Sequence, residues 1–481
     1  PAPSRAEEGL PLSDYREFVA RKLALQPPTG IDRVPDLHES LFPHQRDLVR
    51  WALRRGRAAI FANTGLGKTA MQLEWARVVC EAQGGSVLVL APLAVAEQTV
   101  KEGRRIGVDV TLCREASDVR PGVNVTNYDR LHRFDPSAFV GVVLDESSCI
   151  KHHDASTLRT LLDAFARTAF KLCATATPAP NDWTELGTHA EFLGICTRTE
   201  MLSEFFCHDG GETQVWRLKG HARAQFWRWV ASWGALVQRP SDLGYDDAGY
   251  ALPPLAVEEH VILCSRETAT NAGVLFVSEA KSLMDRRAAR KASTMDRVTE
   301  CARMVNADDL TGEPWIVWCD LNAESEALTK AIPGAVEVRG SDPVDVKAER
   351  LRAFSEGRVR VLVTKPSIAG FGLNWQHCAR VAFVGVTDSW ESYYQAVRRC
   401  WRFGQSRPVA VHIFASEAEG AVLANLRRKE EDARRMGDAL ATETSATVRA
   451  AVLGAVRETN TYAASKRITV PHWLKTEEVA A

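Results

Sequence analysis

The chain has 481 residues, of which 45% are hydrophobic and 25% charged, and this suits a soluble globular protein of two or three domains. Its 60 Lys and Arg residues nearly balance its 61 Asp and Glu residues, so a uniformly basic coat for nucleic acid is excluded, whereas a local basic groove is not. The longest apolar run, Val87 to Ala96, is about half a membrane span and contains a proline, so we expect no transmembrane helix. The N-terminal residues lack an apolar signal region, and the 11 cysteines form no C-x-x-C pair. We therefore expect a cytoplasmic protein with reduced thiols and no structural metal.

The first strongly patterned segment lies at residues 58–83. It follows a proline-containing stretch, residues 1–35, that we expect to be an arm or a small helical cap. Residues 58–62 are apolar, which is typical of a buried strand, and the next seven residues read N-T-G-L-G-K-T. Apolar residues then recur at helical spacing until two consecutive glycines end the pattern. The sequence thus predicts a strand, a glycine-containing loop and a helix.

A loop in this context is suited to binding phosphate, because backbone N–H groups and the helix dipole both point at the anion. Lys68 would reach the β- and γ-phosphates, and the Thr69 hydroxyl would bind Mg²⁺. A magnesium nucleotide also needs a carboxylate at the end of a second buried strand. Residues 139–144 are apolar or glycine, and Asp145 and Glu146 follow directly. We predict that Asp145 holds Mg²⁺ and that Glu146 orients and deprotonates the attacking water.

Further strands are predicted at residues 86–92, 122–128, 139–145 and 169–178, separated by helical stretches. This alternation is typical of a doubly wound parallel sheet, and it predicts one RecA-like lobe. Residues 181–235 follow and are rich in aromatic side chains, which could stack on bases or form a local helical core. We favour the core, because three of these aromatic residues, Phe226, Trp229 and Trp233, recur at the i, i+3, i+7 spacing of a buried helix face.

The second half of the chain predicts another α/β lobe. Residues 281–303 are mainly basic and fit either a phosphate-binding surface or a solvated helix. Residues 315–322 read as the first strand of the lobe. Arg399 and Arg402 are three residues apart, which places them on one face of a helix, and a planar guanidinium suits a γ-phosphate held across a cleft. A charged helix over residues 417–436 would brace the lobes.

Together these segments resemble the superfamily-two helicases, and especially their Swi/Snf-like branch. The phosphate loop of that superfamily often reads A-x-x-G-x-G-K-T, which matches Ala62 to Thr69. Residues 41–53 resemble its adenine-recognition segment. Residues 91–102 and 125–131 resemble its two strand-gripping segments, and ATATPAPN (174–181) resembles its T-G-T-P-x-x-N segment. In the second half, residues 361–385 resemble A-G-G-x-G-L-N-L, and residues 392–405 match Q-A-x-x-R-x-x-R-x-G-Q.

The resemblance implies that ATP and Mg²⁺ bind between two lobes. The residues it implies for nucleotide contact are Phe42, Gln45, Ala62, Asn63, Thr64, Gly65, Leu66, Gly67, Lys68, Thr69, Gly372 and Gln395. The implied magnesium ligands are Thr69 and Asp145, and the implied catalytic residues are Lys68, Glu146, Arg399 and Arg402. The residues it implies for coupling to nucleic acid are Pro92, Tyr128, Ser148, Thr175, Thr177 and Asn374.

The chain departs from the family pattern at four places. The D-E-A-H sequence is replaced by Asp145-Glu146-Ser147-Ser148. Phe371 stands where the family has glycine, and Lys365-Pro366-Ser367 replaces the usual small-polar entry to that loop. Residues 238–240 lack the paired arginines and the lysine of the Swi/Snf-like join between lobes. Because serine reaches less far than histidine, the strength of coupling between ATP turnover and nucleic acid does not follow from the resemblance. The compact linkers look most like helicases of phages and integrated elements.

The expected fold class is α/β, with two RecA-like doubly wound parallel-sheet lobes, helical insertions and a C-terminal helical brace. The expected domains are an ATP-binding lobe at 36–240 with an aromatic-rich helical insertion near 185–235, a linker and helical insertion at 241–310, a second lobe at 311–420 and the brace at 421–481. The resemblance covers roughly residues 36–420.

The function expected from the resemblance is ATP hydrolysis, stimulated by nucleic acid, that moves a monomer along duplex DNA without sequence preference. Protein partners are possible, and their identity is open. One alternative is an RNA-dependent ATPase or helicase with the same engine. Another is a non-catalytic clamp switched by ATP, which would have no use for the full catalytic set. A small-molecule kinase leaves the pattern at residues 395–405 unexplained.

Overall fold

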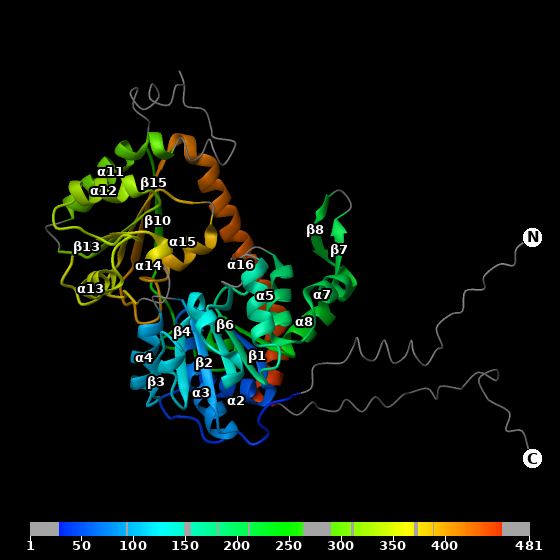
Figure 1. Cartoon of the computed structure of the whole chain (residues 1–481). Helices are drawn as coiled ribbons and strands as arrows, with labels where there is room; N and C mark the ends of the chain where they lie inside the picture. Colours follow the sequence, from blue (N-terminus) through cyan, green and yellow to red (C-terminus); the bar gives the residue numbers. More distant parts are fainter. Residues whose placement is uncertain are drawn as a thin grey trace, which may run out of the picture.

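The computed structural model describes residues 28–92, 95–148, 155–179, 182–209, 212–262, 290–308, 312–369, 374–387 and 389–454. These residues form two α/β lobes, each built on a parallel sheet, with a long C-terminal helix beside them (Figure 1). The predicted fold class of two RecA-like lobes is confirmed. Within these ranges, no helix combines the length and the apolar character needed to cross a membrane.

The first lobe contains a seven-stranded parallel sheet with the order β3-β4-β2-β5-β6-β1-β9. Its strands are apolar almost throughout because helices cover both faces. The carboxyl ends of parallel strands meet at one edge, so β1, β5 and β6 bring residues 62–64, 145–146 and 175–177 together. The strands are β1 (Arg57–Ala62), β2 (Ser86–Ala91), β3 (Val110–Leu112), β4 (Val123–Asn127), β5 (Phe139–Asp145), β6 (Phe170–Thr175) and β9 (Gly234–Val237).

Two groups of helices sandwich this sheet. One apolar layer packs on the face covered by α2 (Pro43–Arg55), α3 (Lys68–Gln83) and α4 (Ala96–Arg105). The other packs on the face covered by α5 (Ala155–Ala164), α6 (Leu186–Leu193), α7 (Arg198–Phe205) and α8 (Arg223–Ala231). The helix α3 ends at Gly84, whose φ of 64° provides a left-handed cap, as its position in the sequence predicted.

The aromatic-rich segment contributes to the second of these layers. Phe226 and Trp233 are fully buried, and Trp229 packs against the same layer, which confirms the predicted core. The segment also contains an antiparallel hairpin of β7 (Phe206–Asp209) and β8 (Glu212–Leu218), which projects from the lobe (Figure 1). The insertion expected to be helical thus contains helices and, in addition, this hairpin. The β-branched and aromatic residues of T-Q-V-W-R-L have high strand propensity, which favours a strand there.

The second lobe contains a six-stranded parallel sheet with the order β10-β15-β14-β11-β13-β12. The edge strand β10 and the helix α11 belong to this lobe, although the sequence analysis assigned their residues to a linker and insertion. The strands are β10 (Leu255–Ile262), β11 (Trp315–Cys319), β12 (Val336–Glu337), β13 (Val361–Thr364), β14 (Arg380–Val384) and β15 (Val409–Ser416). The helices are α11 (Thr294–Ala307), α12 (Asn322–Ala331), α13 (Val344–Ser355), α14 (Pro366–Ala369) and α15 (Trp390–Val397).

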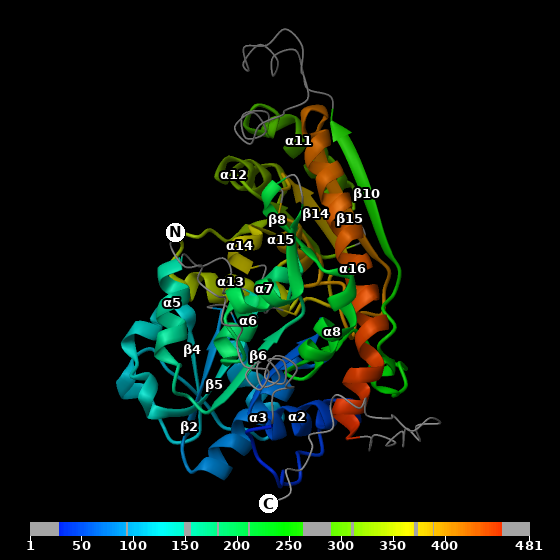
Figure 2. The ribbon, with the colours of Figure 1, turned by 90° about the vertical axis from the view of Figure 1, so that its right-hand side faces the viewer.

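The helix α16 (Gly420–Leu453) joins the two lobes (Figure 2). Leu423 and Leu426, near its start, lie in the apolar core of the second lobe. Val448 and Val452, near its end, lie in that of the first lobe, where the helix packs on α2, α8 and β9. This is the position that a brace between the lobes requires.

Candidate active site

The glycine-containing loop lies between β1 and α3. Gly65 and Gly67 have φ angles of 95° and 78°, a conformation that favours glycine. Both also lie at points of close approach. A Cβ atom at Gly67 would come within 2.3 Å of Gln45 Nε2, and one at Gly65 within 2.8 Å of Phe403 Cβ in the second lobe. The loop is therefore in contact with the start of α2 on one side and with the second lobe on the other.

Gln45 connects the start of α2, which the sequence predicts to recognise adenine, to this loop. Its Oε1 accepts a hydrogen bond from the Phe42 backbone N–H at 3.0 Å, and its Nε2 donates to the Leu66 carbonyl at 2.9 Å. Phe42 is 48% exposed, and its ring lies parallel to that of His44 with the centroids 6.0 Å apart. Tyr250 stands edge-on to Phe42 with the ring centroids 6.0 Å apart, and it also packs against Phe403 at 4.7 Å. Aromatic side chains from both lobes thus surround the expected place of the base.

Two carboxylates and an ammonium group meet at the carboxyl edge of the first sheet. Asp145 ends β5 and is buried, and Gln72 Nε2 donates to its Oδ1 at 2.7 Å. Burial and the neighbouring Glu146 raise the pKa of Asp145 to about 6. Burial lowers the pKa of Lys68, and the two carboxylates oppose this shift, while its Nζ donates to the Ala62 carbonyl at 3.0 Å. Among the described residues, Glu146 is the one non-glycine residue with a positive φ, 49°, a strained conformation of the kind found at functional sites.

Two arginines of the second lobe face these carboxylates. The helix α15 ends at Val397, so the prediction that Arg399 and Arg402 lie on one helix face is wrong. A backbone hydrogen bond from Arg399 N to the Ala396 carbonyl, at 3.2 Å, tightens the chain beyond the helix. Burial lowers the pKa of both arginines to about 10, and the negative charge of Glu146 opposes this shift in each case. Arg399 and Arg402 therefore lie within electrostatic reach of the first lobe.

A chain of hydroxyl groups runs from Glu146 to the second lobe. Thr175 Oγ1 lies 3.4 Å from Glu146 Oε2 and 3.2 Å from Ser148 Oγ. Thr177 Oγ1 lies 3.4 Å from Ser148 Oγ and 3.2 Å from Oε1 of Glu391, which belongs to α15. Three hydroxyl protons serve four contacts, so with both carboxylates ionised one contact always lacks a proton. The arrangement of these protons can therefore shift in response to either carboxylate.

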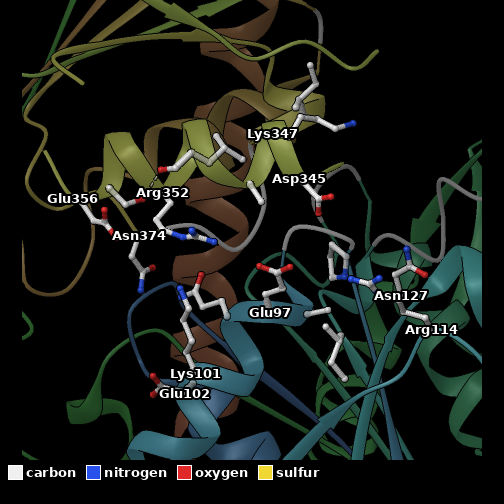
Figure 3. A pocket seen from close by; sticks show the side chains of 18 of the residues that line it. Glu97, Lys101, Glu102, Arg114, Asn127, Asp345, Lys347, Arg352, Glu356 and Asn374 are labelled. Carbon is white, nitrogen blue, oxygen red and sulfur yellow. Dashed lines mark hydrogen bonds between the residues drawn. The ribbon is translucent and has the colours of Figure 1, made fainter. Parts of the chain in front are cut away.

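A cavity of about 960 Å³ lies between the lobes, away from the residues expected to contact ATP. The helix α4 of the first lobe and α13 of the second form two of its walls (Figure 3). Pro92 and Asn374, both expected to contact a nucleic-acid strand, line it together with Asn127. Its basic residues are Lys101, Arg105, Arg114, Arg130, Lys347 and Arg352, and its acidic residues are Glu97, Glu102, Asp345 and Glu356.

The remaining predicted residues divide into two groups. Tyr128, Ser148, Thr175 and Thr177 lie next to the carboxylates and not in the cavity, and the Tyr128 hydroxyl donates to the Asp145 carbonyl at 2.7 Å. The expected nucleotide-contact residues Ala62, Asn63, Thr64, Leu66 and Thr69 belong to the loop or to the ends of β1 and α3 beside it, and Gln395 is buried in α15. Gly372 lies outside the described residues. The roles assigned to all these residues stay predictions.

Sequence reasoning missed three residues at this site. Gln72 follows Thr69 by three positions, a spacing that places both on one face of α3, so its contact with Asp145 could have been foreseen. Tyr394, whose hydroxyl donates to Asn63 Oδ1 at 3.1 Å, and Glu391 reach across from the second lobe. No local pattern marks these two residues, because their contacts exist only when the lobes meet.

The comparison with protein families identifies the second lobe. Residues 297–404, from α11 to the glycine after the arginine pair, match the family described as the helicase conserved C-terminal domain. No curated protein matches the chain. The matched residues cover most of the second lobe, which is therefore similar to the helicase conserved C-terminal domain.

Proposed function

We propose that this protein is a motor that hydrolyses ATP between its lobes and uses the resulting motion to travel along duplex DNA. The observation that carries the proposal is the meeting of the phosphate loop and Glu146 with Arg399 and Arg402 of the second lobe. A catalytic site that takes residues from both lobes is complete only when the two lobes are closed against each other. Each round of binding, hydrolysis and release can therefore move one lobe against the other.

The residues of the first lobe fit a magnesium nucleotide. Gln45 and the exposed face of Phe42 would hold the adenine, and the backbone N–H groups of the loop would hold the phosphates. The crowding around Gly65 and Gly67 leaves no room for a side chain, so backbone can approach the phosphates closely. Thr69 and Asp145 would hold Mg²⁺, which when bound neutralises charge on the phosphate oxygens.

The catalytic step follows from the charges on the two sides. Glu146 orients a water molecule at the γ-phosphate and accepts its proton. Arg399 and Arg402 stabilise the charge that develops on the transferred phosphoryl group, and Lys68 does so from the first lobe. Opening the lobes withdraws both arginines, so hydrolysis is confined to the closed state.

The cavity between the lobes is the proposed track. Its six basic and four acidic residues suit contact with a phosphate backbone at defined points, and they provide no wide basic field. Contacts of this kind position a strand without reading its bases, so we expect no sequence specificity. The choice of duplex DNA over RNA, and of translocation over strand separation, rests on the Swi/Snf-like resemblance of the sequence.

A direct connection between track and catalytic site supports the coupling of the two. Asn127 lines the cavity, and the next residue, Tyr128, bonds through its hydroxyl to the backbone carbonyl of Asp145. A nucleic-acid strand that moves Asn127 would therefore also disturb the magnesium carboxylate. The hydroxyl chain from Glu146 to Glu391 is a second route, because it ends on the lobe that moves.

The test is a triplex-displacement assay run beside a strand-unwinding assay, each with ATP and with Glu146→Gln as the inactive control. We expect ATP-dependent displacement of the third strand and no unwinding of a forked duplex. Efficient unwinding without displacement would overturn duplex translocation, and ATPase stimulation by RNA alone would favour the RNA-dependent alternative. Tight ATP binding without turnover on any nucleic acid would favour the clamp.

A further inference from the structure

We infer that Glu258, His260 and His412 form a binding site for a divalent transition metal of the zinc class at the edge of the second sheet. The three side chains belong to β10 and β15, on the lobe that carries the arginine pair but apart from the ATP site. The site does not depend on the proposed motor function.

The register of the two strands brings these residues onto one face. Glu258 and His412 are direct partners in the parallel pairing of β10 with β15. His260 follows Glu258 by two positions, so it projects from the same face of β10. The donor atoms of all three residues lie within 4.8 Å of one another.

The distances suit a tetrahedral ion. His260 Nε2 lies 3.2 Å from His412 Nδ1, and Glu258 Oε2 lies 3.4 Å from the same Nδ1. Metal–nitrogen bonds of about 2.0–2.1 Å in a tetrahedral zinc site place neighbouring ligand atoms about 3.3–3.4 Å apart. Two histidines and one carboxylate are also a ligand set that zinc uses when one position is left for water.

Hydrogen bonding alone satisfies this cluster poorly. His412 Nδ1 faces both a ring nitrogen and a carboxylate oxygen, yet a neutral imidazole nitrogen either donates one proton or accepts one. If Nδ1 accepts from His260, it has no proton for the Glu258 carboxylate; if it donates to Glu258, it cannot accept from His260. A cation bound at the centre satisfies all three donor atoms at once.

Aromatic neighbours hold both rings in place. His260 stacks on Phe414 with the ring centroids 4.7 Å apart and 16° between the planes. His412 is buried and stacks on Trp315 at 5.5 Å and 29°. Glu258, by contrast, keeps 59% of its side chain exposed, which gives an ion a path from solvent. The site is therefore preformed on the histidine side and open on the carboxylate side.

Metal binding here would pin the edge strand β10 onto β15, where the chain first enters the second lobe. The sequence gives no sign of it, because the two histidines are 152 residues apart. The expectation of no structural metal was based only on ligands that are close together in the sequence.

The experiment titrates the untagged full chain, free of metal and nucleotide, with Co²⁺ and with Zn²⁺. Co²⁺ is followed by its visible absorption, Zn²⁺ by calorimetry and by the fluorescence of tryptophan, since Trp315 packs on His412. The variants are Glu258→Gln and His260→Asn, both away from the buried ring, and the control is His221→Ala, which removes an exposed histidine of the first lobe. Circular dichroism checks that each variant is folded.

We expect one equivalent of ion to bind with a tetrahedral Co²⁺ spectrum. Binding should weaken at least tenfold in both ligand variants, since even the loss of a second-shell partner costs about 10–100-fold. The His221→Ala control should bind like wild type. Failure of the wild-type chain to bind either ion would overturn the site, and so would binding that the two ligand variants leave unchanged.

Discussion

The hydroxyl chain between Glu146 and Glu391 predicts that two residues far from the γ-phosphate are energetically coupled in catalysis. Glu391→Gln removes the charge at the second-lobe end of the chain, and Thr177→Val removes the hydroxyl that contacts it. The glutamine amide can still meet the Thr177 hydroxyl but carries no charge, so Glu391→Gln weakens the link that Thr177→Val removes, and the second change should add little once the first is made.

The contact distances set the magnitude. The four contacts measure 3.2–3.4 Å, which is long for hydrogen bonds between oxygen atoms, so we assign them the value of a neutral hydrogen bond and not the higher value of a charged one. A net contribution of about 1 kcal/mol in the transition state corresponds to roughly a fivefold change in rate. We therefore expect kcat/KM for ATP in the presence of duplex DNA to fall about fivefold in each single variant, and by little more in the double variant.

The assay is steady-state ATP hydrolysis for wild type, both single variants and the double variant, at saturating DNA. Glu326→Gln, which changes a half-exposed glutamate on α12, controls for the loss of one negative charge from the second lobe. A coupling energy near 1 kcal/mol supports the chain. Full additivity of the two changes, or single variants as active as wild type, would refute it.

Three further predictions follow from the site. The Glu146→Gln variant should still close its lobes on ATP but hydrolyse ATP at least about 100-fold more slowly, whereas Arg402→Ala should lose a comparable rate and also close less. A lobe-to-lobe distance probe with ATP separates the two variants. Closure and turnover of Arg402→Ala at wild-type levels would contradict the second lobe's role. Gln72→Ala removes the donor that holds Asp145, so the Mg²⁺ concentration for half-maximal turnover should rise several-fold. A rise in the KM for ATP with no change in the Mg²⁺ requirement would contradict this. Burial lowers the pKa of His44 from 6.5 to about 4, so the unfolded chain binds more protons than the folded chain between these pH values. The free energy of unfolding should therefore drop by up to about 3 kcal/mol as the pH falls from 6.5 to 4. The His44→Phe variant should flatten this fall, as measured by urea unfolding, and an unchanged pH profile would count against the prediction.

Local pattern was enough to predict the elements that carry the first half of the site. The phosphate loop is recognisable because a buried strand, two glycines and a helix are consecutive in sequence, and β1 and α3 have those positions. Asp145 and Glu146 are recognisable for the same reason, since β5 is a continuous apolar run that ends at the first of them.

Elements whose form depends on distant contacts were missed. The edge strand β10 follows two prolines and is largely exposed, so its segment resembles a linker until β15 pairs with it. The turn that carries Arg399 looks helical by spacing, yet its backbone bonds to Trp375 in another segment. Neither fact is encoded in a window of neighbouring residues.

The same limit applies within the site. Glu391 and Tyr394 gain their partners across the lobe interface, and the proposed metal ligands His260 and His412 gain theirs across a strand pair. Their residue types are ordinary and their neighbours give no periodic signal. Only the folded arrangement reveals that they can act together.

The most direct test of the account is the rate of ATP hydrolysis by the purified chain without nucleic acid and with single-stranded DNA, duplex DNA or RNA, measured in parallel for wild type and Lys68→Ala. The account predicts a slow basal rate, clear stimulation by duplex DNA that weakens as salt is raised, and no stimulated turnover in Lys68→Ala. A wild-type rate that no nucleic acid changes, or a stimulated rate that survives the loss of Lys68, would contradict it.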